Sequence, residues 1–258
     1  MPEYLEITTQ IGCRVNCIKY CPQELIVKNY FGNRILLLDR FIELMYTVPT
    51  NIPILFAGVS EPFQNQNCID MIEWVHNRGN PVSVSSTLVG LTYDDCIRLC
   101  DIPLERFVLH LPDACGNANI PITDEYAKCL CKIMTSIQNL EFMSMNGTFV
   151  TNRVEHMARG TAPRRHSSRV LCDMLETPGY QLMPNGAVFF CCMMRGLTGG
   201  VGSLDDQSYP DLISKHKAIS YQLQTNRDSI CHRCVMSNNY YWQHINRHII
   251  AMKKRMSI

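Results

Sequence analysis

Three cysteines lie close together near the start of the chain, at Cys13, Cys17 and Cys21. Three clustered thiolates can hold an iron–sulfur cluster and leave one iron open to another ligand. Structural zinc sites favour paired two-residue spacings and four ligands, so this spacing indicates iron–sulfur chemistry instead. The alternative is that the cysteines form one stripe of a buried helix, which Gly12 and Pro22 at the ends of the segment disfavour.

A second set of cysteines lies in the last third of the chain, and its four thiolates would close a cluster completely. The set consists of Cys172, Cys191, Cys231 and Cys234. Between the first two, Asn185-Gly186 separates two β-prone runs and predicts a hairpin, because both residues tolerate positive φ. Cys192 is an alternative to its neighbour as a ligand. Structural zinc is the alternative metal, since four cysteines are also a zinc pattern.

Composition limits the kind of protein this is. The chain has 258 residues and is 46% hydrophobic, which is enough to form a buried core. Its net charge of +1 gives no excess of positive charge that would favour binding to nucleic acid or acidic membranes. The first residues lack the pattern of a signal peptide, and no later run is apolar and long enough to span a bilayer. We therefore expect a soluble cytoplasmic protein that acts on small molecules.

The 14 cysteines, in a chain without a secretion signal, indicate reduced thiols rather than a disulfide framework. Half of them belong to the two sets above. Most of the others are expected to be small core residues without metal ligation, namely Cys68, Cys96, Cys100, Cys115, Cys129 and Cys131.

Strand and helix patterns alternate through the first 145 residues. Strands are predicted at 5–9, 52–58, 82–86, 106–111 and 140–145, and helices at 35–46, 68–78, 93–100 and 124–138. This order predicts an α/β fold with a parallel sheet or barrel that binds ligands at the carboxyl ends of its strands. A loop-rich connection over 146–168, a small β appendage over 180–190 and a helix over 239–258 are expected to follow.

The cysteine loop after the first predicted strand resembles that of the radical S-adenosylmethionine (SAM) enzymes, which have a partial (β/α)6 barrel. In that family three cysteines, usually spaced Cys-x3-Cys-x2-Cys, hold a 4Fe–4S cluster whose open iron binds SAM. One electron cleaves SAM to a 5′-deoxyadenosyl radical, which abstracts hydrogen from the substrate. Here the second gap is one residue longer, and Tyr20 occupies the place of the family's aromatic residue.

Two further segments resemble SAM-binding parts of the family. The run Gly58-Val-Ser-Glu-Pro62, at the end of the second predicted strand, is similar to its Gly-Gly-Glu-Pro motif. The resemblance implies that Glu61 and nearby backbone, with Gly58 and Ser60, receive the SAM amino group. Ser85, Ser86 and Thr87 end the third strand, where relatives have hydroxyl residues that contact the SAM ribose. The alternative is that these hydroxyls cap the next helix.

The pattern Cys172-x13-Gly186-x4-Cys191 resembles the signature of the SPASM and twitch auxiliary-cluster domains. No cysteine follows Cys234, so the shorter twitch form, with one auxiliary 4Fe–4S cluster, is implied. The resemblance thus divides the chain into a radical SAM partial barrel at 1–160 and a β-hairpin and helix twitch-type domain at 161–258.

The arrangement is similar to 2-deoxy-scyllo-inosamine dehydrogenase and to radical SAM proteins of surface-glycan gene clusters. This implies an oxidoreductase that oxidises a carbohydrate-like or cyclitol alcohol, with the auxiliary cluster as electron acceptor and flavodoxin or ferredoxin as reductant. Arg159, in the run Arg159-Gly160-Thr161, lies where such dehydrogenases have an Arg-Gly-Gly turn that contacts substrate. The alternative is a solvated basic loop. His110 and Asp113, after the fourth strand, are candidates for a polar contact or a proton acceptor; a structural histidine is the alternative.

Two other functions fit the cysteine sets. One is a radical SAM peptide maturase, although such enzymes commonly carry an N-terminal peptide-recognition domain and only 12 residues precede Cys13. The other is a non-catalytic metal-binding module, which the strand-following cysteine loop and Glu61 disfavour.

Overall fold

An eight-stranded sheet is the framework of the computed structural model, with strand order β5-β4-β3-β2-β1-β7-β8-β9. The structure describes residues 3–17, 21–113, 116–144, 167–172, 175, 179–191, 197, 199–234 and 237–239. Neighbouring strands from β5 to β7 are parallel, and β8 and β9 continue the sheet antiparallel. The strands are β1 (Tyr4–Thr8), β2 (Ile54–Ala57), β3 (Val82–Ser86), β4 (Arg106–Leu111), β5 (Leu140–Ser144), β7 (Gly179–Leu182), β8 (Ala187–Phe189) and β9 (Gly200–Ser203).

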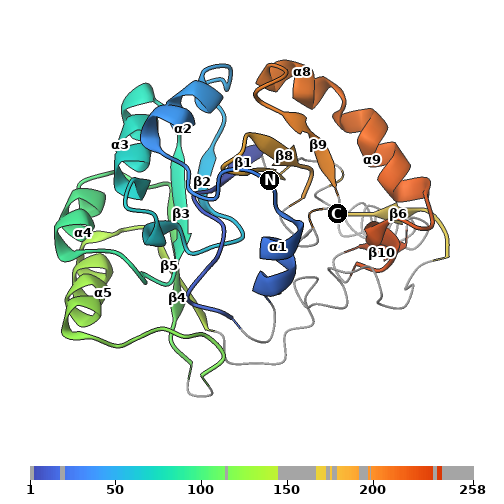
Figure 1. The fold of residues 1–258 in the computed structure, drawn as a ribbon. Coiled ribbons are helices and arrows are strands. Elements are labelled where there is room, and N and C mark those ends of the chain that lie inside the picture. The colour runs from blue at the N-terminus through green and yellow to red at the C-terminus, as the bar shows by residue number, and fades with distance from the viewer. Residues whose placement is uncertain are drawn as a thin grey trace, which may run out of the picture.

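Four helices connect the first five strands and lie together along one side of the sheet (Figure 1). They are α2 (Leu38–Met45), α3 (Cys68–Arg78), α4 (Tyr93–Cys100) and α5 (Asp124–Ser136). The hydroxyls of Thr92 and Thr123 cap α4 and α5 by accepting from backbone N–H groups three residues later. The predicted βα alternation and parallel sheet are confirmed.

The two faces of the sheet differ in polarity. Phe56 of β2 packs against Phe41 of α2 with ring centroids 6.0 Å apart, so its face meets the helical layer. Because strand residues alternate between faces, Glu6 and Ser85 lie on the opposite face, inside the curve of the sheet. Glu6 is buried and accepts a 2.5 Å hydrogen bond from Gln181 of β7. The inner face therefore carries polar groups, and the outer face carries the apolar core.

Two short helices that the sequence patterns did not indicate follow β1 and β2. Helix α1 (Gln23–Asn29) begins directly after Pro22, and the 3₁₀-helix η1 (Pro62–Gln64) follows β2. A small apolar cluster that includes Ile26 of α1 and Val59 holds α1 against the end of the sheet. Both helices thus start at the carboxyl edge, beside the cysteine loop.

The predicted hairpin is confirmed, but it extends the main sheet rather than forming an appendage. Strand β7 pairs with β1 in parallel and with β8 antiparallel. Gly186 takes positive φ (84°), whereas Asn185 does not, and the side chain of Asn185 instead bonds the backbone of Phe31 and Ala187. The predicted domain boundary near residue 160 lies outside the described residues.

The C-terminal elements are fixed to the sheet by buried aromatic contacts. They are β6 (Val170–Leu171), α8 (Tyr209–Ser214), α9 (His216–Thr225), η2 (Ile230–His232) and β10 (Asn238–Asn239). Tyr180 of β7 hydrogen-bonds His216 of α9 at 2.9 Å, and Phe190 stacks on the same imidazole with centroids 4.8 Å apart. Except for Asn239, the helix predicted over 239–258 lies outside the described residues. The loop predicted over 146–168 is described only at its last two residues.

Among the twelve cysteines that the structure describes, none is joined to another by a disulfide bond. Cys68, Cys96 and Cys129 are core residues, and Cys100 is half-buried. Cys131 is exposed, so its assignment to the core is wrong: its position on α5 faces solvent. Cys115 lies outside the described residues. Among the helices that the structure describes, none is long and apolar enough to cross a membrane.

Gly58 is required by close packing between β1 and the turn after β2. Its φ is +96°, and a Cβ there would lie 2.9 Å from Thr8 Cα, in addition to meeting the Thr8 hydroxyl. Gly79 has the same φ of +96° but nothing within 4 Å of its would-be Cβ. Substitution at Gly79 would therefore test the cost of the left-handed backbone alone, whereas substitution at Gly58 adds the steric overlap with Thr8.

We predict that Gly79→Ala lowers the free energy of unfolding by about 1–2 kcal/mol, the cost of left-handed backbone alone. Gly58→Ala should cost about 1–3 kcal/mol more, because the added methyl must displace β1. Urea unfolding of the two apoprotein variants measures both. Equal losses would contradict the role assigned to the Thr8 contact.

Candidate active site

The cysteine loop leaves the carboxyl end of β1 and returns to it at α1. Cys13, Cys17 and Cys21 are all half-buried there. The backbone N–H of Cys21 donates to the Cys17 carbonyl at 2.9 Å, which holds the two ends of the longer second gap together. Tyr20 and the two residues before it lie outside the described residues.

The sulfurs of Cys13 and Cys21 accept hydrogen bonds from the protein. The backbone N–H of Glu61 lies 3.3 Å from Cys13 Sγ, and the side-chain amide of Gln64 lies 3.9 Å from the same sulfur. Gln23 Nε2 lies 3.0 Å from Cys21 Sγ. Burial raises the pKa of the Cys13 thiol, while the Glu61 N–H opposes this by favouring the thiolate. The site therefore offers N–H donors to the sulfurs of Cys13 and Cys21.

The carboxylate of Glu61 joins the ends of β2 and β3. One oxygen accepts from Ser86 Oγ at 2.5 Å and from Phe63 N at 3.4 Å. The other accepts from the backbone N–H and the hydroxyl of Thr87, at 2.7 and 2.6 Å. These bonds occupy about four lone-pair directions, the usual capacity of a carboxylate, so an ammonium binding there would have to exchange with one of them.

The turn after β2 is also tied to the cysteine loop. Ser60 Oγ donates to the carbonyl of Gln10 at 2.7 Å, and Thr9 Oγ1 donates to the carbonyl of Pro62 at 3.0 Å. Asn65 donates to the carbonyls of Thr9 and Leu36, both at 2.7 Å. The Gly58–Pro62 motif and the loop after β1 thus form one hydrogen-bonded unit.

The remaining predicted polar residues lie at the ends of β3 and β4. Ser85 Oγ and His110 Nε2 are 2.9 Å apart on the inner face of the sheet. Asp113 instead accepts from the backbone of Asn117 and Ala118 and from the Asn117 side chain. The structure therefore places Asp113 in a loop cap, and it pairs Ser85 with His110. Arg159 lies outside the described residues.

The C-terminal cysteines approach one another through the β6–β10 pair. Cys172 directly follows β6, and β10 follows Cys234 by a few residues. Burial raises the pKa of Cys231 to about 12, with smaller contributions from Cys234 and Cys172 in the same direction. Three of the four predicted ligands, Cys172, Cys231 and Cys234, are therefore close enough to interact electrostatically. Cys191 is held beside Gly179 by a β-bridge, and Cys192 lies outside the described residues.

Within the described residues, no group of three or more His, Cys, Asp or Glu side chains is arranged around a single metal ion. A four-iron cluster attaches each thiolate to a different iron, so its ligands are spread more widely than those of one ion. The donor chemistry at Cys13, Cys17 and Cys21 suits such a cluster, because thiolates are its ligands and two of these sulfurs already face N–H donors.

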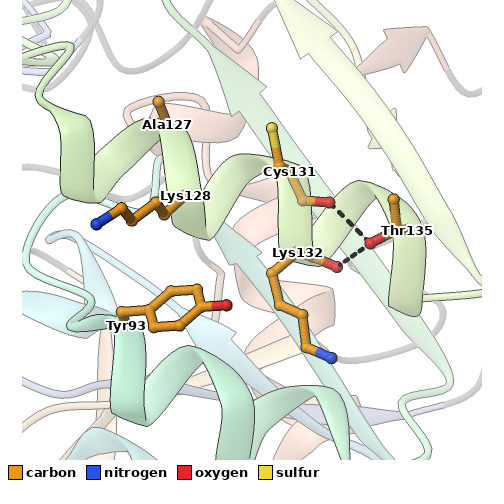
Figure 2. Close-up of a pocket in the computed structure, with 6 residues that line it drawn as sticks. All are labelled: Tyr93, Ala127, Lys128, Cys131, Lys132 and Thr135. Carbon is orange, nitrogen blue, oxygen red and sulfur yellow. Dashed lines mark hydrogen bonds between the residues drawn. The ribbon is translucent and has the colours of Figure 1, made fainter.

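A shallow groove lies elsewhere, on the outer helical layer between α4 and α5 (Figure 2). Tyr93 of α4 faces Lys128 and Lys132 of α5 across it, beside the exposed Cys131. None of the predicted active-site residues lines this groove.

The residues that our sequence analysis missed are amides. Gln23, Gln64 and Asn65 make many of the contacts to the cysteine loop, yet glutamine and asparagine carry no motif of their own. The one available signal was position, since Gln23 directly follows Cys21-Pro22, and Gln64 and Asn65 lie two and three residues after the Gly58–Pro62 motif.

Comparison with solved structures identifies the fold. BtrN, a radical SAM 2-deoxy-scyllo-inosamine dehydrogenase, in complex with AdoMet and 2-DOIA matches with a TM-score of 0.67 at 14% identity, over 93% of this chain and 94% of that one. An open conformation of BtrN gives a TM-score of 0.62 at 13% identity, over 93% and 97% of the two chains. The radical SAM protein anSMEcpe, with AdoMet and the Cp18Cys peptide, gives 0.54 at 11% identity, over 87% and 83%.

The chain therefore has the fold of the radical SAM enzymes, and its structure is similar to that of BtrN. No protein-family model matches the sequence, and no curated protein does.

We predict that Glu61→Ala lowers the free energy of unfolding of the apoprotein by about 1–3 kcal/mol, because the buried N–H of Thr87 loses its acceptor. Glu105→Ala, at an exposed position, is the control and should change it by less than about 0.5 kcal/mol. Urea unfolding at neutral pH measures both.

The contribution of Glu61 to the free energy of unfolding should also depend on pH. Burial raises the pKa of Glu61 above its ordinary value, so ionised Glu61 weakens the fold as pH rises through the raised pKa. The alanine variant should lack this dependence. An identical pH profile in both proteins would contradict the buried carboxylate.

Proposed function

We propose that the chain is a radical SAM oxidoreductase that oxidises a carbohydrate-like or cyclitol alcohol. The supporting observation is the line of hydrogen bonds from Cys13 through Glu61 to Ser86 and Thr87. It joins the carboxyl ends of β1, β2 and β3, where ligands bind in α/β sheets. In the similar fold of BtrN, AdoMet is bound together with 2-DOIA, a small molecule.

In this proposal Cys13, Cys17 and Cys21 hold a 4Fe–4S cluster, and Cys172, Cys191, Cys231 and Cys234 hold an auxiliary one. When bound, the first cluster would supply the electron for SAM cleavage, received from flavodoxin or ferredoxin, and the second would take up the electron that substrate oxidation releases. Glu61 positions the loop that receives the SAM amino group, through Gly58, Ser60 and the neighbouring backbone. The tight turn at Gly58 lets the backbone approach closely.

The proposed substrate side of the site is the polar inner face of the sheet. Oxidation of an alcohol to a ketone removes a hydrogen atom from carbon, a proton from oxygen and one further electron. His110, held by Ser85 at 2.9 Å, is the proposed proton acceptor. Asp113 is committed to its loop cap and is proposed only to orient that loop. Arg159 remains a proposed substrate contact.

The rival is a peptide maturase, because the anSMEcpe fold also matches and holds a peptide. The chain spans 94% of BtrN and 83% of anSMEcpe, and the TM-score is higher for BtrN. These values favour the small-molecule oxidoreductase.

The two-cluster proposal predicts about eight irons per chain after anaerobic reconstitution, and 5′-deoxyadenosine on reduction with SAM. Cys13→Ala should abolish SAM cleavage and retain about four irons, those of the auxiliary site. Cys131→Ala, at an exposed cysteine, is the matched control and should behave as wild type. About four irons in wild type without SAM cleavage would contradict the proposal.

The oxidoreductase proposal predicts ketone formation from one member of a panel of sugars and cyclitols. His110→Gln should lower the rate of ketone formation about 100-fold or more, while abortive SAM cleavage continues. His76→Gln, on the outer helix α3, is the control. Loss of mass from a peptide, with no ketone from any polyol, would favour the maturase.

A further inference from the structure

Two glutamines contact the cysteine loop in the same way from opposite sides. Gln23 comes from the first turn of α1, and Gln64 comes from the end of η1. In each case the side-chain oxygen accepts a backbone N–H of the loop, and the side-chain nitrogen lies against a cysteine sulfur. Neither residue belongs to a motif that the proposed function uses.

Gln23 links both ends of the loop to the turn after β2. Its Oε1 accepts the backbone N–H of Cys13 at 3.1 Å. Its Nε2 lies 3.0 Å from Cys21 Sγ and 2.6 Å from the carbonyl of Val59. Because one partner is a backbone donor and the other a backbone acceptor, the orientation of the amide is fixed, and its N–H must face the sulfur.

Gln64 makes the matching contacts from the other side. Its Oε1 accepts the backbone N–H of Arg14 at 2.9 Å and the side chain of Gln10 at 3.3 Å. Its Nε2 then faces Cys13 Sγ at 3.9 Å. The side chain is buried, with 9% of the residue exposed, so these bonds are little disturbed by water.

We propose that Gln23 and Gln64 are positioning residues that hold the cysteine loop in shape and tune the reduction potential of the cluster it binds. This inference rests on the proposed function for the presence of that cluster. The two amides fix the backbone at Cys13 and Arg14, and they donate to the sulfurs at both ends of the loop. The loop that these amides hold is longer than usual, because one additional residue separates its second and third cysteines.

The direction of the effect follows from electrostatics. An N–H that donates to a ligating sulfur stabilises negative charge, and the reduced cluster carries one more negative charge than the oxidised one. Removing the donor therefore disfavours reduction and lowers the potential. In Gln23→Leu and in Gln64→Leu we expect about a tenfold smaller reduction equilibrium constant, which for one electron is about 59 mV.

The test is an anaerobic redox titration of the reconstituted protein, followed by the electron paramagnetic resonance (EPR) signal that responds to SAM. Gln66→Leu, at an exposed position two residues after Gln64, is the matched control and should titrate like wild type. Gln23→Glu keeps the acceptor for Cys13 N–H but replaces the donor by a negative charge, so its potential should fall further than that of Gln23→Leu. Circular dichroism of each variant checks that the fold is retained.

The possible outcomes separate the inference from the proposed function. Wild-type midpoints in Gln23→Leu and Gln64→Leu would overturn the inference. Selective loss of the SAM-responsive cluster from these variants, with Gln66→Leu unchanged, would support their positioning role. A wild-type protein without any SAM-responsive signal would instead overturn the proposed function.

Discussion

The buried carboxylate of Glu61 is the contact on which the candidate site depends. Its two oxygens accept hydrogen bonds from the hydroxyl of Ser86 and from the backbone and hydroxyl of Thr87, which ties the turn after β2 to the end of β3. Its own backbone N–H then reaches the sulfur of Cys13, in the loop after β1. Burial of this carboxylate is costly and raises its pKa, and hydrogen bonds from Ser86, Thr87 and Phe63 offset part of that cost.

The rest of the molecule supports this junction from two directions. Gly58 allows the turn after β2 to lie against Thr8, which brings the Glu61 segment next to β1. On the far side of β1, β7 pairs in parallel, and Tyr180 anchors α9 through His216. The C-terminal cysteines and the N-terminal cysteine loop are therefore parts of a framework that shares β1 as its central strand.

Much of the fold could be predicted from the sequence because its elements carry strong local signals. The helical period of apolar residues predicted α3 with its observed ends. The alternation of strand and helix patterns in the first 145 residues predicted that the strands pair in parallel. The pairing of β7 with β1 could not be predicted, because it joins residues more than 170 positions apart and leaves no local pattern. The exposed position of Cys131 was missed because a cysteine on a helix suits either the core or the surface.

The sequence indicated the cysteines and the Glu61 motif as candidates, but it did not indicate the contacts that the structure shows around them. Ser86 was expected to contact a ligand, and the structure shows it bonded to Glu61. Asp113 was expected to face the active site, and it caps its own loop. Gln23 and Gln64 were missed, because side-chain amides act through geometry that only the folded chain provides.

The central claim is that the loop from Cys13 to Cys21 binds a cluster whose open iron receives SAM. The most direct measurement is EPR spectroscopy of the reduced, reconstituted protein with and without SAM labelled at its amino nitrogen. The account predicts a changed signal and a hyperfine coupling to the labelled nitrogen, both lost in Cys13→Ala. A reduced cluster whose spectrum is unaffected by SAM would contradict it.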